Sequence, residues 1–141
     1  MGRVPRFAVL LRWCAVIALA YVHAWSAAQG DIAGTWTTEG GDSKVQITVA
    51  GGTLSGKLVW LKAADSLDAH NPDPALRDKP LLGATILTGF KSAAGGAWQG
   101  GTVYAPRSGK HYPAELALLS DGRLQLKVNA GLMSKTETWV R

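Results

Sequence analysis

Residues 111–129 of the chain, HYPAELALLSDGRLQLKVN, decide its fold. In each half of this stretch the apolar residues recur at every second position: Tyr112, Ala114, Leu116 and Leu118, then Leu124, Leu126 and Val128. A period of two is typical of β-strands that turn one face to a core and the other to water. Asp121-Gly122 between the halves is turn sequence. The stretch therefore predicts two strands joined by a short turn.

The same pattern extends over most of the chain. Glycine-containing turns separate the other runs at short intervals: Gly40-Gly41-Asp42, Gly51-Gly52, Gly95-Gly96 and Ser108-Gly109. We expect about eight strands, over residues 34–38, 44–49, 53–62, 85–90, 97–104, 111–119, 123–129 and 135–140. Short connections favour one all-β domain, a single antiparallel up-and-down meander. Eight such strands close naturally into a barrel, which removes exposed sheet edges; a sandwich is the alternative, but it usually needs longer crossovers.

One long loop, residues 63–82, interrupts the meander. It contains Pro72, Pro74 and Pro80. A loop of this length in a compact domain is commonly functional or mobile. A short helical turn over residues 73–77 fits, because Asn71 or Asp73 could cap it and proline is tolerated in a first helical turn.

Residues 1–28 have the pattern of an export signal. Arg3 and Arg6 precede an almost wholly apolar segment, and Ser26-Ala27-Ala28 has the small-x-small pattern that signal peptidase cleaves. The uninterrupted apolar run, residues 13–22, is about half of what a bilayer-spanning helix needs. We expect cleavage near Ala28/Gln29, a mature domain over residues 29–141 and a periplasmic or secreted location with no permanent membrane span. A retained N-terminal anchor is the alternative.

Composition then excludes several classes of function. Removing residues 1–28 leaves twelve Lys and Arg against ten Asp and Glu, a net charge of +2, with no basic stripe of the kind that nucleic-acid binding needs. Cys14, the one cysteine, leaves with the signal, so neither a disulfide nor a thiol nucleophile remains. We expect no nucleic-acid partner.

Two sets of motifs carry a family resemblance. Gly34-Thr35-Trp36 resembles the Gly-x-Trp signature of lipocalin-type barrels, in which the glycine lets the strand bend and the indole plugs the closed end. An arginine near the end of the last strand often lies across that indole, and Arg141, after Trp139, is the candidate. The resemblance implies structural roles for Gly34, Trp36 and Arg141, and core packing is the expected role of Trp139.

The wider pattern is more specific. It consists of Gly34-Thr35-Trp36, LSGKLVW at 54–60, NPDPALR at 71–77, PLLG at 80–83, WQGGTVY at 98–104, Pro106, GKHY at 109–112 and TWVR at 138–141. In this order the motifs resemble the DUF2147 family of exported bacterial proteins, whose function is uncharacterised. The resemblance implies a lipocalin-like (calycin-like) barrel and supplies no reaction.

The candidate ligand-binding residues are Trp60, Asn71, Arg77, Tyr104 and Tyr112. Three are aromatic residues near strand ends, which suits either a core or the mouth of a ligand cavity. Arg77 could offer a fixed fork to a carboxylate or phosphate, or could instead pair with Asp73 or Asp78 and hold the loop. The carboxylates and His70 of the same loop lack metal-site spacing, so we expect no metal and no cofactor.

No catalytic constellation stands out, and we expect that the protein is not an enzyme. Ser108 and His111 are interpreted as surface turn residues, and Glu115 and Glu137 as residues of the outer, solvated face. Two functional hypotheses remain. The first is an exported protein that binds a small apolar or amphipathic ligand in or at the mouth of the barrel, whose interior holds one small ligand at most. The second is a module with a filled barrel that docks a cell-envelope partner.

Overall fold

The computed structural model describes residues 31–141, and the predicted signal at 1–28 lies outside the described residues. The described residues form eight strands: β1 (Gly34–Thr37), β2 (Ser43–Ala50), β3 (Thr53–Leu61), β4 (Thr85–Ser92), β5 (Ala97–Ala105), β6 (Lys110–Leu118), β7 (Leu124–Ala130) and β8 (Met133–Trp139). Two 3₁₀ turns accompany them, η1 (Pro74–Leu76) and η2 (Ala94–Gly96). The all-β prediction of eight strands is confirmed, and of the two candidate caps, Asn71 and Asp73, it is Asp73 that caps η1.

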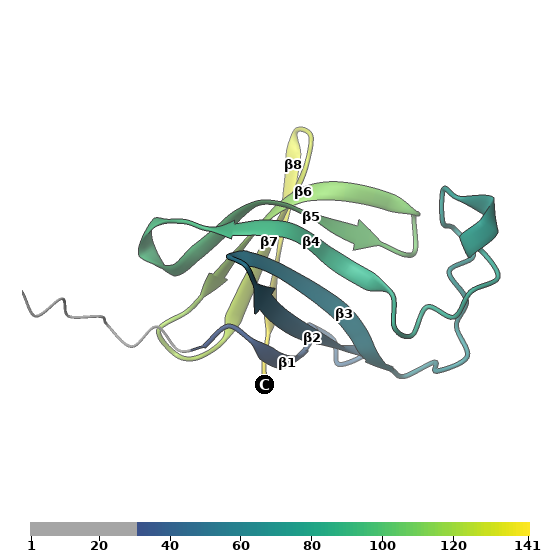
Figure 1. Ribbon diagram of the computed structural model, residues 1–141, viewed down its shortest axis with the longest axis horizontal. Coiled ribbons are helices and arrows are strands. Elements are labelled where there is room, and N and C mark those ends of the chain that lie inside the picture. Colours follow the sequence, from purple (N-terminus) through teal and green to yellow (C-terminus); the bar gives the residue numbers. More distant parts are fainter. Residues whose placement is uncertain (1–30) are drawn as a thin grey trace, which may run out of the picture.

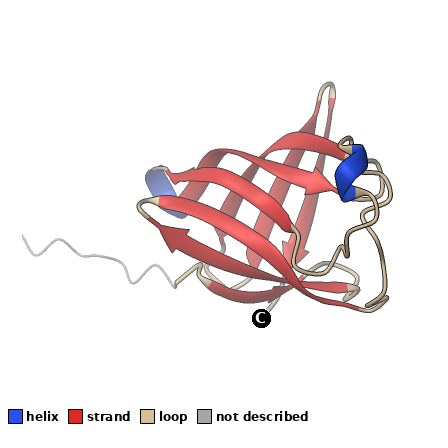
Figure 2. Cartoon of the chain, turned by 45° about the vertical axis from the view of Figure 1, so that its right-hand side comes forward, coloured by secondary structure: helices blue, strands red, loops and turns tan. Residues whose placement is uncertain are grey.

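The strands form one sheet in sequence order, β1 to β8, with every neighbouring pair antiparallel. This is the predicted up-and-down meander, and it replaces the alternative of two packed sheets. The sheet curls into a half-barrel (Figures 1 and 2). The long loop lies at the same end as the β5–β6 turn, and the β7–β8 hairpin projects from the curl (Figure 1).

The concave face of the sheet holds the core. Its largest fully buried side chains come from both halves of the sheet: Trp36, Trp139, Phe90, Ile47, Leu54, Leu87, Leu116, Leu124, Leu126 and Val45. Burying two indoles requires partners for their N–H groups. Trp36 Nε1 donates to the Ile32 carbonyl at 2.8 Å, and Trp139 Nε1 donates to Glu137 Oε2 at 3.1 Å.

Two glycines let this interior close around its large side chains. A Cβ atom at Gly101 would overlap the ring of Phe90, and one at Gly56 would lie 2.9 Å from Leu87 Cδ1 and 3.0 Å from Val45 Cγ1. The missing side chains on β3 and β5 thus let Leu87 and Phe90 of β4 approach the neighbouring backbone. At these two positions the side chains of β4 occupy the interior of the half-barrel.

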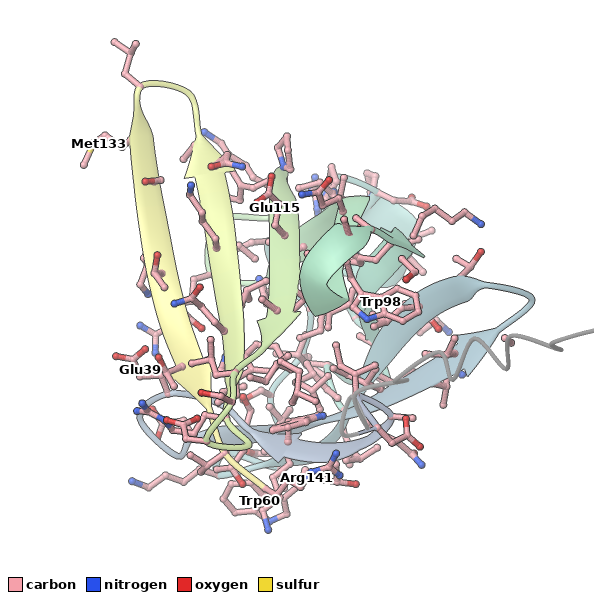
Figure 3. All side chains as sticks on the ribbon, turned by 90° about the vertical axis from the view of Figure 1, so that its left-hand side faces the viewer. Glu39, Trp60, Trp98, Glu115, Met133 and Arg141 are labelled. Atoms are coloured by element: carbon pink, nitrogen blue, oxygen red, sulfur yellow. The ribbon has the colours of Figure 1, made fainter. Side chains whose placement is uncertain are left out.

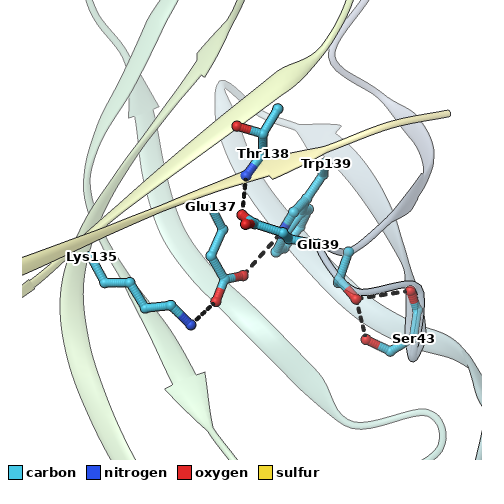
Figure 4. A network of polar contacts seen from close by, with 7 residues as sticks. Glu39, Ser43, Lys135, Glu137, Thr138 and Trp139 are labelled. Carbon is cyan, nitrogen blue, oxygen red and sulfur yellow. Dashed lines mark hydrogen bonds and ion pairs between the residues drawn. The ribbon is translucent and has the colours of Figure 1, made fainter.

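The first and last strands meet over a short seam. Thr37 N–H donates to the Val140 carbonyl at 2.6 Å, and Val140 N–H donates back to Thr37 at 3.0 Å. Beyond this bridge a side chain replaces the missing strand, because Glu39 Oε2 accepts the Thr138 N–H at 2.9 Å (Figure 4). β1 has 4 residues and β8 has 7, so β8 extends past its neighbour. The expectation that closure removes every exposed edge is therefore wrong for the outer part of β8.

Arg141 lies across Trp36 at the other end of the seam. Its guanidinium carbon is 4.4 Å from the centre of the indole, and its two terminal nitrogens donate to the carbonyls of Ala33 and Asp31. Gly34 has a φ of +131°, and a Cβ atom there would lie 2.7 Å from Arg141 Nη1. The Gly-x-Trp motif thus needs glycine at position 34 for two reasons: the backbone angle favours glycine, and a side chain there would collide with Arg141.

The two glutamates of β6 and β8 lie on opposite faces. Glu115 is exposed opposite Lys127 on the outer face, as expected. Glu137 pairs with Leu126, whose side chain is buried in the core, so the expectation of an outer position for Glu137 is wrong. The indole N–H of Trp139 explains the inward position, because it needs a hydrogen-bond acceptor beside the core and Glu137 Oε2 supplies one. The other carboxylate oxygen of Glu137 forms an ion pair with Lys135 at 2.8 Å (Figure 4).

Candidate functional site

The long loop between β3 and β4 is folded back on itself. Leu67 and Pro80 form an isolated β-bridge, flanked by hydrogen bonds from Asp68 N–H to the Lys79 carbonyl at 3.0 Å and from Leu81 N–H to the Ser66 carbonyl at 2.8 Å. The loop thus forms a closed flap whose tip is η1, beside the β5–β6 turn (Figure 2).

The polar residues of the NPDPALR motif fold the tip of this flap. Asn71 Oδ1 accepts the Asp73 N–H at 2.9 Å, and Asp73 Oδ1 accepts the Ala75 N–H at 3.0 Å, the geometry of successive Asx caps. Arg77 Nε donates to the Asn71 carbonyl at 2.8 Å. Arg77 therefore holds the loop through a backbone carbonyl, whereas the sequence suggested an aspartate as its partner.

A buried polar pair joins the loop to the sheet. Asp68 is only 6% exposed; its Oδ1 accepts the hydroxyl of Tyr104 at 2.6 Å and its Oδ2 accepts Asn71 Nδ2 at 2.7 Å. Tyr104 follows Val103, which faces the core, so its phenol emerges on the opposite face of β5, under the loop. Burial, the hydrogen bond to Asp68 and the charge of that carboxylate raise the pKa of Tyr104 to about 12.

Two histidines lie next to this pair. The rings of His111 and Tyr104, cross-strand partners on β6 and β5, are 4.8 Å apart and inclined by 34°. The backbone of His70 lies against Gly109 in the β5–β6 turn, so closely that a Cβ atom at Gly109 would overlap the His70 carbonyl oxygen. The loop is thus attached to the sheet at two points, Asp68–Tyr104 and His70–Gly109.

A hollow of about 470 Å³ lies between the attached loop and the sheet. Tyr104 and His111 line its sheet side, and Asp68, Leu76, Lys79 and Leu82 are among the loop residues that line it. The two leucines are 43% and 41% exposed, so the hollow offers apolar surface to a ligand beside a histidine and a lysine. A cleft that combines apolar walls with a few polar groups is the usual form of a small-molecule site.

The structure brings together only some of the sequence-predicted ligand residues. Asn71 and Tyr104 both line the hollow and share Asp68 as a partner. Arg77 lies in the same loop and bonds Asn71. Tyr112 is half-buried against the core and pairs with Val103, so it lies on the concave face. Trp60 is 43% exposed on the outer surface, where the Lys44 ammonium is 5.9 Å from its ring centre (Figure 3).

Sequence reasoning missed Asp68, His111 and the two leucines as parts of one site. The signal that was present is the alternation along β5: with Val103 inward, Tyr104 must point outward, where a loop has to cover it. The loop residues of the site, Asp68 and the two leucines, reach their positions because the loop folds back on itself. The periodicity of the sequence does not predict that fold.

Of the catalytic candidates, Ser108 donates its hydroxyl to the Ala105 carbonyl at 3.3 Å, while His111 stacks on Tyr104. Over residues 31–141, no group of three or more His, Cys, Asp or Glu side chains is placed to hold a metal ion. In that same part of the chain, no helix is long and apolar enough to cross a membrane.

A second hollow, of about 650 Å³, lies at the opposite end of the half-barrel. Its lining includes Ile32, Val49, Trp98 and Leu118. Neither of these two hollows is lined by the fully buried side chains Trp36, Phe90 or Leu126. Both hollows therefore lie away from these core residues.

Comparisons with known proteins agree with this geometry. The family described as "Uncharacterized protein conserved in bacteria (DUF2147)" matches residues 34–141. Among solved structures, protein HP1028 from Helicobacter pylori, described as belonging to the lipocalin family, is similar with a TM-score of 0.71 and 25% sequence identity, covering 79% of this chain and 82% of that one. No curated protein sequence matches the chain.

Proposed function

The chain belongs to the DUF2147 family, and from this premise we propose that it is a ligand-binding protein of the bacterial cell envelope that holds a small apolar or amphipathic molecule in the hollow beneath the long loop. The lipocalin-family neighbour supports a carrier role by analogy of fold. The export signal expected at residues 1–28 supports the location. The ligand would lie at the mouth, in the hollow, because Leu87 and Phe90 pack tightly against Gly56 and Gly101 inside the half-barrel.

One observation carries the proposal: of the three exposed leucines in the long loop, Leu76 and Leu82 line the hollow, and a buried hydrogen bond fixes that loop to the sheet. Leu76 and Leu82 are held over a 470 Å³ hollow by the Asp68–Tyr104 attachment. A preformed apolar surface costs little ordering entropy when a ligand binds. The apolar part of a ligand fits against these leucines, and its polar end reaches His111 and Lys79.

The test is native mass spectrometry of the protein purified from the envelope of its host. We expect a discrete added mass that is lost on denaturation. Leu82→Asp should abolish it, because the new carboxylate would have to lose its hydration under an apolar ligand. Val59→Asp is the matched control, since Val59 is also 41% exposed but does not line the hollow. Bare protein, or equal loss in both variants, contradicts the proposal.

The second candidate function, docking of a cell-envelope protein by a filled barrel, rests on the packing of Phe90 over Gly101. Its test is crosslinking in intact cells from a photoreactive residue placed at Leu76. A protein adduct would support docking through the loop, and recovery of monomer alone would count against it.

A further inference from the structure

The outer half of β8 is an unpaired edge with a defined set of free backbone groups. Thr138 and Val140 direct their N–H groups away from β7, toward Glu39 and Thr37 respectively. The β7–β8 register is continuous, so the same direction recurs at every second residue. The N–H and C=O groups of Ser134 and Thr136 therefore face away from β7, where the sheet formed by residues 31–141 has no further strand (Figure 3).

The same hairpin also carries the most exposed apolar side chains of the described residues. Leu132 at the turn and Met133 at the start of β8 are 107% and 77% exposed, and Figure 3 shows Met133 projecting at the far end from Arg141. A protruding apolar tip beside an open edge is a combination that proteins ordinarily cover or block.

We propose that this edge pairs with β8 of a second copy of the chain, antiparallel and centred on Thr136, so that the two half-barrels share one continuous sheet. Each Thr136 N–H then bonds the other copy's Thr136 carbonyl, and each Ser134 N–H bonds the other copy's Thr138 carbonyl. The pairing ends at Thr138, whose own N–H is held by Glu39. The interface is isologous, which gives a closed dimer.

Charge selects this register over its neighbours. Centred on Thr136, the pairing places Lys135 of each copy directly opposite Glu137 of the other, both on the concave face. Centred on Lys135, it would place the two ammonium groups opposite each other, which is destabilising. Centred on Ser134, it would place Lys135 opposite Met133. A lysine in an edge strand commonly prevents pairing. Here Lys135 instead favours one register, because only the pairing centred on Thr136 places it opposite Glu137 of the other copy.

Sedimentation velocity over a concentration series tests the proposal on the purified full chain. We expect a reversible dimer that is weak, because a single strand pair buries little area. Thr136→Pro should abolish it, since the lost N–H points away from β7 and the fold loses no ladder bond. Dimerisation that survives this change, or a wild-type chain that stays monomeric at the highest concentration, overturns the proposal.

The charge arrangement allows a sharper test with two variants. Lys135→Glu and Glu137→Lys each place like charges across the two-fold axis, and each should weaken self-association about tenfold or more. An equimolar mixture should recover the dimer, because every cross-strand pair in the mixed species is again opposite in charge. Circular dichroism verifies that Glu137→Lys, which loses the acceptor for Trp139, is still folded. Failure of the mixture to associate, with both variants folded, overturns the register.

Discussion

The hydroxyl group of Tyr104 donates a 2.6 Å hydrogen bond to the buried carboxylate of Asp68, 36 positions earlier in the chain. This bond joins the loop of the candidate site to the wall of the half-barrel. It also couples the stability of the loop to the protonation state of one phenol.

Alkaline pH should destabilise the protein through Tyr104. Its pKa is raised from 10.0 to about 12, so above pH 10 the unfolded chain loses the phenol proton while the folded chain keeps it. The stabilisation is complete below pH 10 and is lost as the pH rises through 12, an effect of about 2–3 kcal/mol. Urea unfolding from pH 8 to 12 should show this decline in the wild type relative to Tyr104→Phe. A constant difference between the two proteins would contradict the prediction; Tyr112→Phe is the control.

Gly109→Ala should detach the loop. Gly109 has a φ of +66°, and an alanine Cβ would overlap the His70 carbonyl oxygen. The left-handed angle alone costs about 1–2 kcal/mol, and Gly122→Ala isolates that cost, because Gly122 has a φ of +83° with nothing within 4 Å of an added Cβ. We expect faster hydrogen exchange at the Asp68 and Asn71 amides in Gly109→Ala only. Equal exchange in both variants would show that His70 does not hold the loop.

Arg141→Ala should open the seam. The change removes the cation–π contact with Trp36, about 0.5–2 kcal/mol, and leaves the carbonyls of Asp31 and Ala33 without their guanidinium donors. Arg123→Ala, which removes only an exposed ion pair with Asp121, should destabilise the protein much less. Chemical denaturation measures both; an Arg141 variant as stable as the Arg123 variant would refute this role.

Gly101→Ala should strain the core, because the new methyl group overlaps the Phe90 ring. Overpacking of this kind costs about 1–3 kcal/mol. Combining it with Phe90→Leu should cost less than the sum of the two single changes, since the smaller side chain vacates the space. Strict additivity would mean that the two residues do not compete for the same volume.

Alternation along the strands was enough to predict the fold. Leu124, Leu126 and Val128 indicate a strand even when the neighbouring strands are not known, because one face of the sheet is buried and every second residue, which lies on that face, is therefore apolar. Turn glycines supplied the connectivity. The exception is Glu137, whose position on the concave face follows from the cross-strand register and from the acceptor that Trp139 needs.

The candidate site was harder to predict, because it depends on contacts between distant segments. Asn71 and Tyr104 were identified from residue type and position, and Asp68 brings them together. Trp60 was a candidate because it lies near the end of a strand, but a bulge in the β2–β3 pairing places it opposite Lys44 on the outer surface. A one-residue irregularity changes the face of a side chain, and sequence periodicity does not reveal where it occurs.

The short seam also bears on the order of folding. Every other strand pair joins neighbours in the sequence, so each hairpin can form as soon as its two strands are available, whereas the seam unites Arg141 with Ala33 across 108 positions. Within residues 31–141, closing so long a loop costs more chain entropy than forming any hairpin, so we expect the seam to form after the local strand pairs. Substitutions at Val140 or Arg141 should therefore accelerate unfolding and leave the refolding rate nearly unchanged.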